Sequence, residues 1–241
     1  MRHRMRKRLP MNSHHRLSDS APIAPPAASA RPAVDELRHL LAERFALSAR
    51  APARLLATGL PALDKVIGRL PLGALTEVCC TAPSCGSHLL LGQLLDITRR
   101  TQRRVALVDA ADSFDPASFP SSDLEHLVWV RCQGANPALA LTDILIRDAN
   151  LGLVVLDLRP VSAADLRRVP ATQWYRLQRA VEATDLALVV ETPSACIASA
   201  HVRLSLHQPQ SPDSWQRERR TLVEALSPSV ERQRAIRAFG R

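Results

Sequence analysis

The chain has 241 residues, of which 46% are hydrophobic, so it can bury one substantial core and a second domain only if that domain is small. No apolar run reaches the roughly 18 residues of a membrane span, so no contact with the membrane is expected. The basic start MRHRMRKRL lacks the apolar segment of a secretory signal, although an Arg-rich organellar transit peptide stays an alternative. We therefore expect a cytoplasmic protein.

The net charge of +9 lies at the two ends of the chain. Residues 1–50 contain ten basic and four acidic side chains, residues 213–241 contain seven and four, and the part between them is neutral. Basic tails bind nucleic acid or another polyanion through counterion release. A solvated extension is an equally good alternative, because aromatic residues for base stacking make up only 3% of the chain. The candidate DNA-binding residues of the first tail are Arg2, Arg4, Arg6, Lys7 and Arg8.

The five cysteines form an odd set without C-x-x-C spacing, which argues against a disulfide framework and against structural zinc. Cys79 and Cys80 are adjacent on a predicted strand, so their side chains point to opposite faces. We expect buried thiols rather than metal ligands, and a reducing compartment.

Residues 1–33 are predicted to form a disordered tail, because they end in the Pro- and Ala-rich stretch SAPIAPPAASARPA. Asp35 then opens a helical pattern, DELRHLLAERFAL, with apolar residues at helical spacing. This helix is expected to pack on the core, and docking on a partner is the alternative.

From residue 76 onward, short apolar runs alternate with helical patterns. Strands that are buried on both faces give such runs, and their alternation with helices predicts a parallel sheet. We therefore predict an α/β fold with a doubly wound, mostly parallel sheet flanked by helices, over residues 34–212. The segments are ALTEVCC, HLLLGQLLDITRR, RVALVDA, LVWVRC, ALALTDILIRDA, LVVLDL, YRLQRAVEAT, LALVVET and HVRLSL.

Residues 213–241 depart from this rhythm, since they begin with Pro and Ser and are rich in Arg. They are predicted to form a short strand plus a basic helix, and to act as an interaction segment that offers steering charge and apolar anchors. A strand packed on the core is the alternative. The candidate partner- or DNA-binding residues are Arg217, Arg219, Arg220, Leu222, Leu226, Arg232, Arg234 and Phe239.

The stretch TAPSCGSHLLLGQLL, residues 81–95, follows a predicted strand where a nucleotide-binding protein has its phosphate loop. A working loop reads G-x-x-x-x-G-K-[ST], because backbone N–H groups wrap phosphate, Lys meets its charge and a hydroxyl binds Mg²⁺. Here Thr81, Gly86, Ser87 and His88 occupy those four positions, and only the second glycine matches.

The neighbouring motifs resemble the RecA family in the same order. The stretch ATGLPALDKVIGRLPLGALTEV is similar to the entry of RecA-type ATPases, with its Thr-Gly, Leu-Asp and Pro-x-Gly. RVALVDAADSFDP resembles the second core strand and its closing Asp-Pro, and ILIRDANLGLVVLDL resembles the helix and Walker B strand that end in Asp157. DLALVVET and ASAHVRLSL resemble the sensor strand and the edge strand. The resemblance covers residues 57–206 and implies a RecA-like fold.

The resemblance also implies that the catalytic parts are missing. In the family, a carboxylate after the second strand activates water, and the matching position here is Ala111. The lysine position is Ser87, and the imidazole of His88 is a poor magnesium ligand. We therefore expect no cofactor and no ATPase activity. Asp115 and Asp157 are retained at family positions, but an acid at the end of a strand often caps the following turn, which is the favoured interpretation.

A RecA-like fold without its ATPase parts and without long DNA-binding loops resembles two bacterial families. The closer one is ImuA, an accessory family of SOS-induced translesion DNA synthesis, which implies an adaptor for an inactive Y-family polymerase relative and an error-prone replicative-type polymerase, with RecA as a further candidate partner. The other is the SulA family of cell division inhibitors. Two more alternatives are a DNA-binding module of recombination and a weak ATPase, which would need Asp157 and a cation from Arg99, Arg100 or a neighbouring subunit.

Overall fold

The structure is a computed structural model that describes residues 54–234. Seven strands form its main sheet, in the order β5-β4-β6-β7-β3-β8-β9. All neighbours are parallel except β8 and β9, which are antiparallel. The strands are β3 (Ala74–Cys80), β4 (Arg104–Asp109), β5 (Leu127–Arg131), β6 (Leu151–Asp157), β7 (Ala187–Thr192), β8 (Val202–Leu206) and β9 (Ser229–Gln233). The α/β class, the mostly parallel sheet and the RecA-like fold are thus confirmed.

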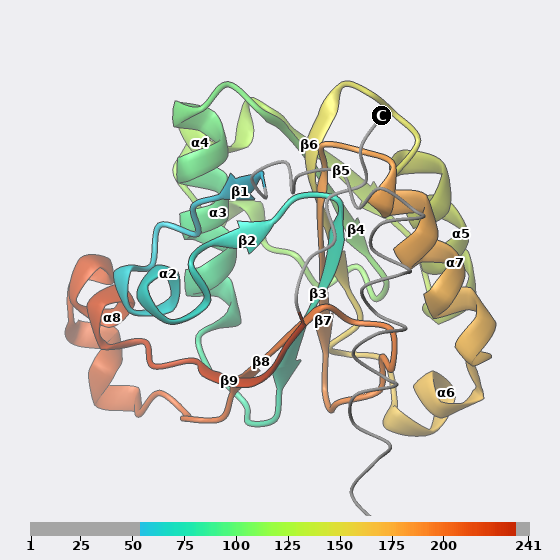
Figure 1. Cartoon of the computed structure of the whole chain (residues 1–241). Coiled ribbons are helices and arrows are strands. Elements are labelled where there is room, and N and C mark those ends of the chain that lie inside the picture. The colour runs from blue at the N-terminus through green and yellow to red at the C-terminus, as the bar shows by residue number, and fades with distance from the viewer. Residues whose placement is uncertain (1–53, 235–241) are drawn as a thin grey trace, which may run out of the picture. The chain divides into compact units, whose positions relative to one another are not determined.

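Helices cover both faces of this sheet, as Figure 1 shows. One face carries α2 (Pro61–Ile67), α3 (Ser87–Arg100), α4 (Ser121–Leu124) and α8 (Arg219–Ala225), and the other carries α5 (Ala135–Leu145), α6 (Ala163–Arg168) and α7 (Ala171–Glu182). Successive side chains of a strand point to opposite faces, so Val154 of β6 lies in one apolar cluster and Val155 in the other. The central strands are buried on both sides, which is why their sequences are continuous apolar runs.

The Thr-Gly and Leu-Asp pairs of the sequence have a structural role in the turn before α2. Strand β1 (Leu55–Leu56) precedes α2 in the sequence and β2 (Leu70–Pro71) follows it, and the two strands pair antiparallel. The Asp64 carboxylate accepts hydrogen bonds from the backbone N–H and the hydroxyl of Thr58, each at 2.9 Å. Gly59 lies between them with a φ of 77°, a conformation that favours glycine. These contacts close the turn before α2.

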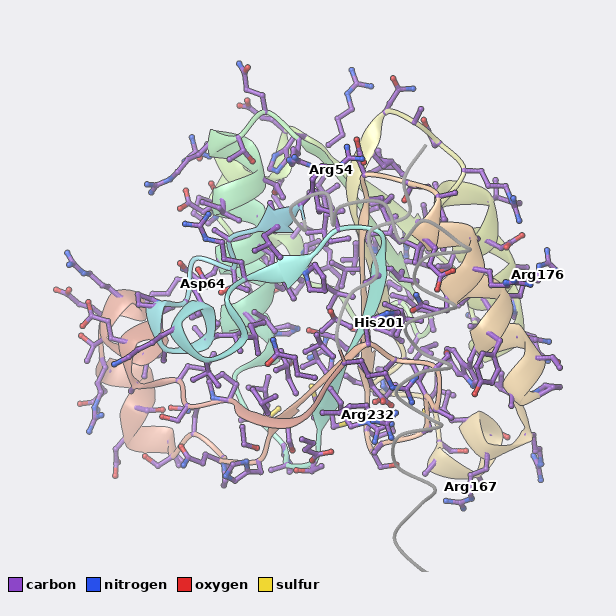
Figure 2. The ribbon with its side chains drawn as sticks, in the orientation of Figure 1. Arg54, Asp64, Arg167, Arg176, His201 and Arg232 are labelled. Atoms are coloured by element: carbon purple, nitrogen blue, oxygen red, sulfur yellow. The ribbon has the colours of Figure 1, made fainter. Side chains whose placement is uncertain are left out.

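Charged side chains lie on the outer surface of the helices. Figure 2 shows Arg167 and Arg176 pointing away from the sheet, and Arg176 binds Asp143 at 2.6 Å. Across residues 54–234, no helix combines the length and apolar character that crossing a bilayer requires.

The C-terminal segment is built into this fold up to the end of β9. After the 3₁₀ turn η2 (Pro212–Gln216), helix α8 buries Val223, the C-cap residue Leu226 is also buried, and β9 pairs with β8. The boundary expected at residue 212 is therefore not a boundary of the core, because the apolar side of α8 and the edge of β8 both need covering. The order is helix then strand, the reverse of the expected order, and β8 is not an edge strand.

Several predictions fall on parts of the chain that lie outside the described residues. They are the tail of residues 1–33 with its basic residues at positions 2 to 8, the helix expected from Asp35, and Phe239.

Candidate functional site at the loop after β3

The loop of residues 81–86 joins the carboxyl end of β3 to α3, at the lower edge of the sheet in Figure 1. In open α/β sheets, ligands bind outside the carboxyl ends of the strands. Gly86 is the N-cap of α3 with a φ of 92°, and no side chain caps the first N–H groups of this helix. The loop therefore has the position and the helix start of a phosphate loop, although its sequence has lost the lysine.

Arg159 extends into the site from the residues just after β6. Its guanidinium binds Asp157, with Nε 2.9 Å from Oδ1, and its Nε lies 2.9 Å from Oε2 of Glu191 at the end of β7. It also donates a hydrogen bond to the Ser87 hydroxyl and lies 3.3 Å from Nε2 of His88. One cation thus joins the loop after β3 to the ends of β6 and β7. We call Arg159, Asp157, Glu191 and Ser87 the Arg159 cluster.

The two carboxylates of this cluster are shielded from water. Asp157 is 4% and Glu191 is 3% exposed. Burial raises the pKa of Glu191 to about 8, the Asp157 charge adds to this rise, and Arg159 opposes it. At neutral pH the guanidinium therefore faces a Glu191 carboxyl that is largely protonated.

The Arg159 cluster occupies the place where a nucleotide site would need free ligands. Asp157, at the Walker B position, is in an internal ion pair, and Ser87, at the lysine position, accepts a hydrogen bond from Arg159. Sequence reasoning missed both Arg159 and Glu191. The available signal was the Arg two residues after Asp157, at the end of a strand that is buried on both faces.

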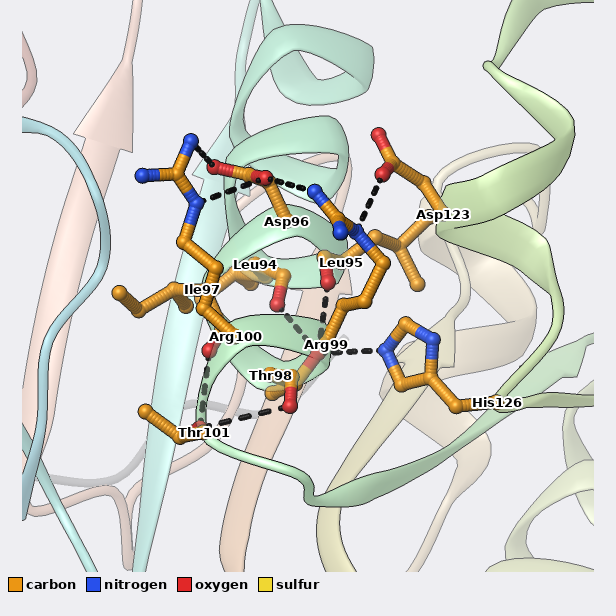
Figure 3. A network of polar contacts seen from close by, with 10 residues as sticks. All are labelled: Leu94, Leu95, Asp96, Ile97, Thr98, Arg99, Arg100, Thr101, Asp123 and His126. Atoms are coloured by element: carbon orange, nitrogen blue, oxygen red, sulfur yellow. Dashed lines mark hydrogen bonds and ion pairs between the residues drawn. The ribbon is translucent and has the colours of Figure 1, made fainter.

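A weak ATPase would need a cation in place of the missing lysine, and two arginines of α3 were candidates for it. Both lie at the C-terminal end of α3, away from the loop. Figure 3 shows Arg99 and Arg100 in its last turn, where both bind Asp96 and Arg99 also binds Asp123. From Ser87 to Arg99 the helix rises roughly 18 Å at 1.5 Å per residue. These arginines do not contact the site within this chain.

The turn after β4 contains the position of the water-activating carboxylate of the RecA family. Ala111 is exposed there, and the nearest buried acid, Asp109, accepts hydrogen bonds from the N–H groups of Ala111 and Phe114 at 3.2 and 2.8 Å. Asp115 accepts from the N–H of Ala117 at 3.0 Å and so caps the 3₁₀ turn η1 (Pro116–Ser118).

The other retained acid, Asp157, accepts from the backbone N–H of Arg159 at 3.0 Å. Both retained acids are therefore in the capping arrangement that the sequence favoured.

Helix α8 covers the loop from outside the sheet. Leu226 is 3% exposed and fills the space beside Gly86, where any side chain in place of the glycine would meet it. Arg219 donates to the carbonyl of His88 at 3.2 Å, and its guanidinium lies 5.3 Å from the ring of Phe119. A cavity of about 330 Å³ stays open between α8 and the loop. Its lining includes Ser84, Ser87, His88, Arg159 and Leu222.

The remaining predicted binding residues of the C-terminal segment differ in accessibility. Arg217 and Arg220 are exposed, and Arg220 forms an ion pair with the exposed Glu224. Arg232 and Arg234 each donate to the carbonyl of Ala198 at 3.0 Å, so they fasten β9 to the core.

The short connection after β7 is fixed by a buried acid. Glu77 of β3 accepts hydrogen bonds from the N–H groups of Cys196 and Ile197 at 2.7 and 3.0 Å, and it binds Arg203 of β8 at 2.6 Å. The place where the RecA family has a long DNA-binding loop is thus a short segment that is hydrogen-bonded to the sheet.

Comparison with known proteins agrees with this fold. The chain is 30% identical to RecA of Streptomyces ambofaciens over 112 residues, which is 45% of this chain and 30% of that protein. It is 30% identical to RecA of Clavibacter michiganensis over 118 residues, 47% of this chain and 32% of that protein. The chain is thus distantly similar to RecA, in agreement with its RecA-like fold. No family model matches it.

The aligned part of the chain spans about a third of the length of these curated relatives. The similarity is distant, at 30% identity.

Proposed function

We propose that this RecA-like chain is a non-catalytic accessory protein of SOS-induced translesion synthesis, of the ImuA kind. In this role it links an inactive Y-family polymerase relative to an error-prone replicative-type polymerase. The observation that carries the non-catalytic part is the Arg159 cluster, in which an internal cation binds the Walker B carboxylate. An ATPase would need that carboxylate free for Mg²⁺ and its water.

Two further features support the loss of hydrolysis, and a third supports the loss of a RecA-type DNA-binding loop. Leu226 packs on the glycine of the loop. Ala111 has no group that accepts a proton from water. The connection after β7 is short and hydrogen-bonded to Glu77, so the chain lacks room there for a long mobile DNA-binding loop. A core of this kind serves as a scaffold for partners rather than as a motor.

The first experiment measures ATP hydrolysis by the full chain with and without single-stranded DNA. We expect no turnover above buffer, and none in Arg159→Ala, because freeing Asp157 does not restore a water-activating group. Arg100→Ala is the matched control, since it removes an arginine from α3 without touching the loop. Turnover that disappears in Asp157→Ala would contradict the proposal.

The second experiment tests the adaptor role by co-purification with the inactive Y-family polymerase relative. Truncation after residue 212 would remove β9 and buried Leu226, so it would damage the core as well as the surface. Charge reversal of the exposed Arg217 and Arg220 is sharper, and we expect it to weaken co-purification while the circular dichroism spectrum stays unchanged. Reversal of Arg167 and Arg168 on α6 is the matched control.

Equal binding by both double variants would show that the C-terminal surface is not the docking element. Binding to a tubulin-like division protein in place of the polymerase relative would favour the SulA alternative.

A further inference from the structure

A second cavity lies on the face of the sheet opposite to α8 and is lined by α6, α7 and the connection of residues 193–201. Its volume is about 220 Å³. Four of its lining residues are exposed, so it opens to solvent; they are Arg167, Tyr175, Ala195 and Ala198. The cavity shares no lining residue with the Arg159 cluster, and Arg220 of α8 lies on the other face.

The size and the walls of this cavity fit a single apolar side chain. Sites for small molecules measure roughly 300–1,000 Å³, which is more than this cavity offers. Its apolar wall residues are Leu166, Val169, Ala171, Trp174, Ala195 and Ala198. A side chain that enters such a hole leaves water, and apolar anchors of this kind are the usual centre of a protein interface.

One wall residue offers a polar contact. Ser199 is 2% exposed, and within residues 54–234 its hydroxyl has no hydrogen-bond partner. A hydroxyl both donates and accepts, and leaving it unpaired in a buried position costs free energy. One backbone N–H or C=O of a bound peptide would satisfy it. A nucleobase brings several polar edge atoms, which these apolar walls would leave unpaired.

Arginines surround the mouth of the cavity. Arg167 lines it directly, and the guanidinium groups of Arg232 and Arg234 each donate to the carbonyl of Ala198 at 3.0 Å, so they lie beside its wall. Figure 2 shows Arg167 and Arg232 in its lower half. None of these three arginines forms an ion pair with a carboxylate of residues 54–234, in contrast to their neighbour Arg168. The mouth therefore favours negative charge.

The acids of the surrounding elements do not offset this charge. Asp165 of α6 pairs with Arg168 at 2.8 Å, and the buried Glu77 pairs with Arg203 at 2.6 Å. Glu77 also accepts a hydrogen bond from the N–H of Cys196 at 2.7 Å, which holds the wall of residues 195–199 in place. A ligand therefore meets a wall that is already ordered.

We propose that this cavity docks an acidic segment of a partner protein, which inserts one apolar side chain and places carboxylates on Arg167, Arg232 and Arg234. The parts of this chain outside the described residues match the mouth poorly in charge. Residues 1–50 contain ten basic and four acidic side chains, and AIRAFGR at residues 235–241 contains two arginines and no acid. The inference needs no polymerase partner, so it stands if the role proposed above fails.

The test on the unchanged full-length chain is fluorescence anisotropy of labelled peptides, in which three aspartates precede and three follow one central residue. We expect a central Phe to give about thirtyfold tighter binding than a central Ala, the difference typical of a buried anchor. A peptide with lysines in place of the aspartates should not bind. Equal affinity of the Phe and Ala peptides, or binding of the lysine peptide, would overturn the proposal.

Two variants of the full chain locate the binding. Ala195→Leu fills the cavity from an exposed position of its wall, and Arg167→Glu reverses a charge at its mouth. Each should weaken binding of the Phe peptide by at least about tenfold. Ala140→Leu on the exposed side of α5 and Arg217→Glu are the matched controls and should bind as the unchanged chain, with circular dichroism as the check on folding. Unchanged binding in both Ala195→Leu and Arg167→Glu would overturn the proposal.

The rival occupants have outcomes of their own. Single-stranded oligothymidylate that displaces the Phe peptide, and whose own binding is lost in Ala195→Leu, would make the cavity a nucleic-acid site and overturn the proposal. Replacement of Ile236 and Phe239 by Ala should leave the peptide affinity unchanged, and a tenfold gain would show that the chain's own C-terminal segment fills the cavity. Sedimentation as a dimer that Ala195→Leu converts to a monomer would assign the cavity to a second copy, which also overturns the proposal.

Discussion

Helix α3 has arginine–carboxylate ion pairs at both of its ends, and the two sets differ in how much water reaches them. In its last turn, Arg99 is 42% and Arg100 is 66% exposed, and both bind Asp96 (Figure 3). At its first residue, Ser87 contacts Arg159, which is 19% exposed and binds carboxylates that are almost fully buried. The partners are chemically alike, so the comparison isolates the effect of burial.

Burial changes what each ion pair contributes. An exposed pair gains little, because water and salt already screen both charges. A buried pair is strongly coupled to its surroundings, since removal of one member leaves an unpaired charge in a low dielectric. We therefore expect the Arg159 cluster to be structurally essential and the pairs at the end of α3 to be nearly neutral for stability.

The largest expected effect is that of Arg159→Ala. The variant leaves Asp157 and Glu191 buried without their cation, so the free energy of unfolding should fall by about 3–5 kcal/mol. Urea denaturation at neutral pH measures this change. Arg159→Lys is the matched control and should lose less, because a cation remains. A loss below about 1 kcal/mol in Arg159→Ala would break the comparison.

Glu191→Gln tests the effect of burial through the pH dependence of stability. The folded-state pKa of about 8 lies above the ordinary value of 4.5, so between these pH values the folded chain binds a proton that the unfolded chain has released. The stability of the unchanged chain therefore falls as pH rises through this window. The variant should remove up to about 1.4 kcal/mol per pH unit of this slope. Parallel slopes for the two proteins, measured by denaturation from pH 5 to 8, would exclude a raised Glu191 pKa.

The smallest expected effect is that of Arg100→Ala. Asp96 stays paired with Arg99 and accessible to water, so the loss should be below about 0.5 kcal/mol and should shrink further in high salt. The same denaturation experiment gives the value. A loss comparable to that of Arg159→Ala would mean that burial does not separate the two ends of the helix.

The sequence predicted the strands of the sheet because burial on both faces leaves a plain signal. ALTEVCC, RVALVDA, LVVLDL and LALVVET each correspond to a strand in the structure. The strand order could not be read in the same way, since it depends on contacts between segments far apart in the chain. The placement of β3 between β7 and β8 is information of this kind.

The sequence predicted which residues of a phosphate loop are missing from the candidate site. It did not predict the residues that occupy the site instead. Thr81, Ser87 and His88 indicate a degenerate loop from the sequence alone. Arg159 and Glu191 enter the site because β6 and β7 are neighbours and end at the same edge. The density of Arg in residues 213–241 suggested an exposed segment, but Val223 of α8 and Leu226 just after it point inward, while the other side of the helix carries the charge.

The position of β3 also has a consequence for biosynthesis. Both neighbours of this central strand come much later in the chain, as the contact between Glu77 and Thr192 illustrates with a separation of 115 residues. At about 5–20 residues per second, a ribosome needs roughly 6–23 s to make that stretch. During this time the apolar strand ALTEVCC has no sheet partner, which is the condition in which an unpaired strand is most prone to aggregate.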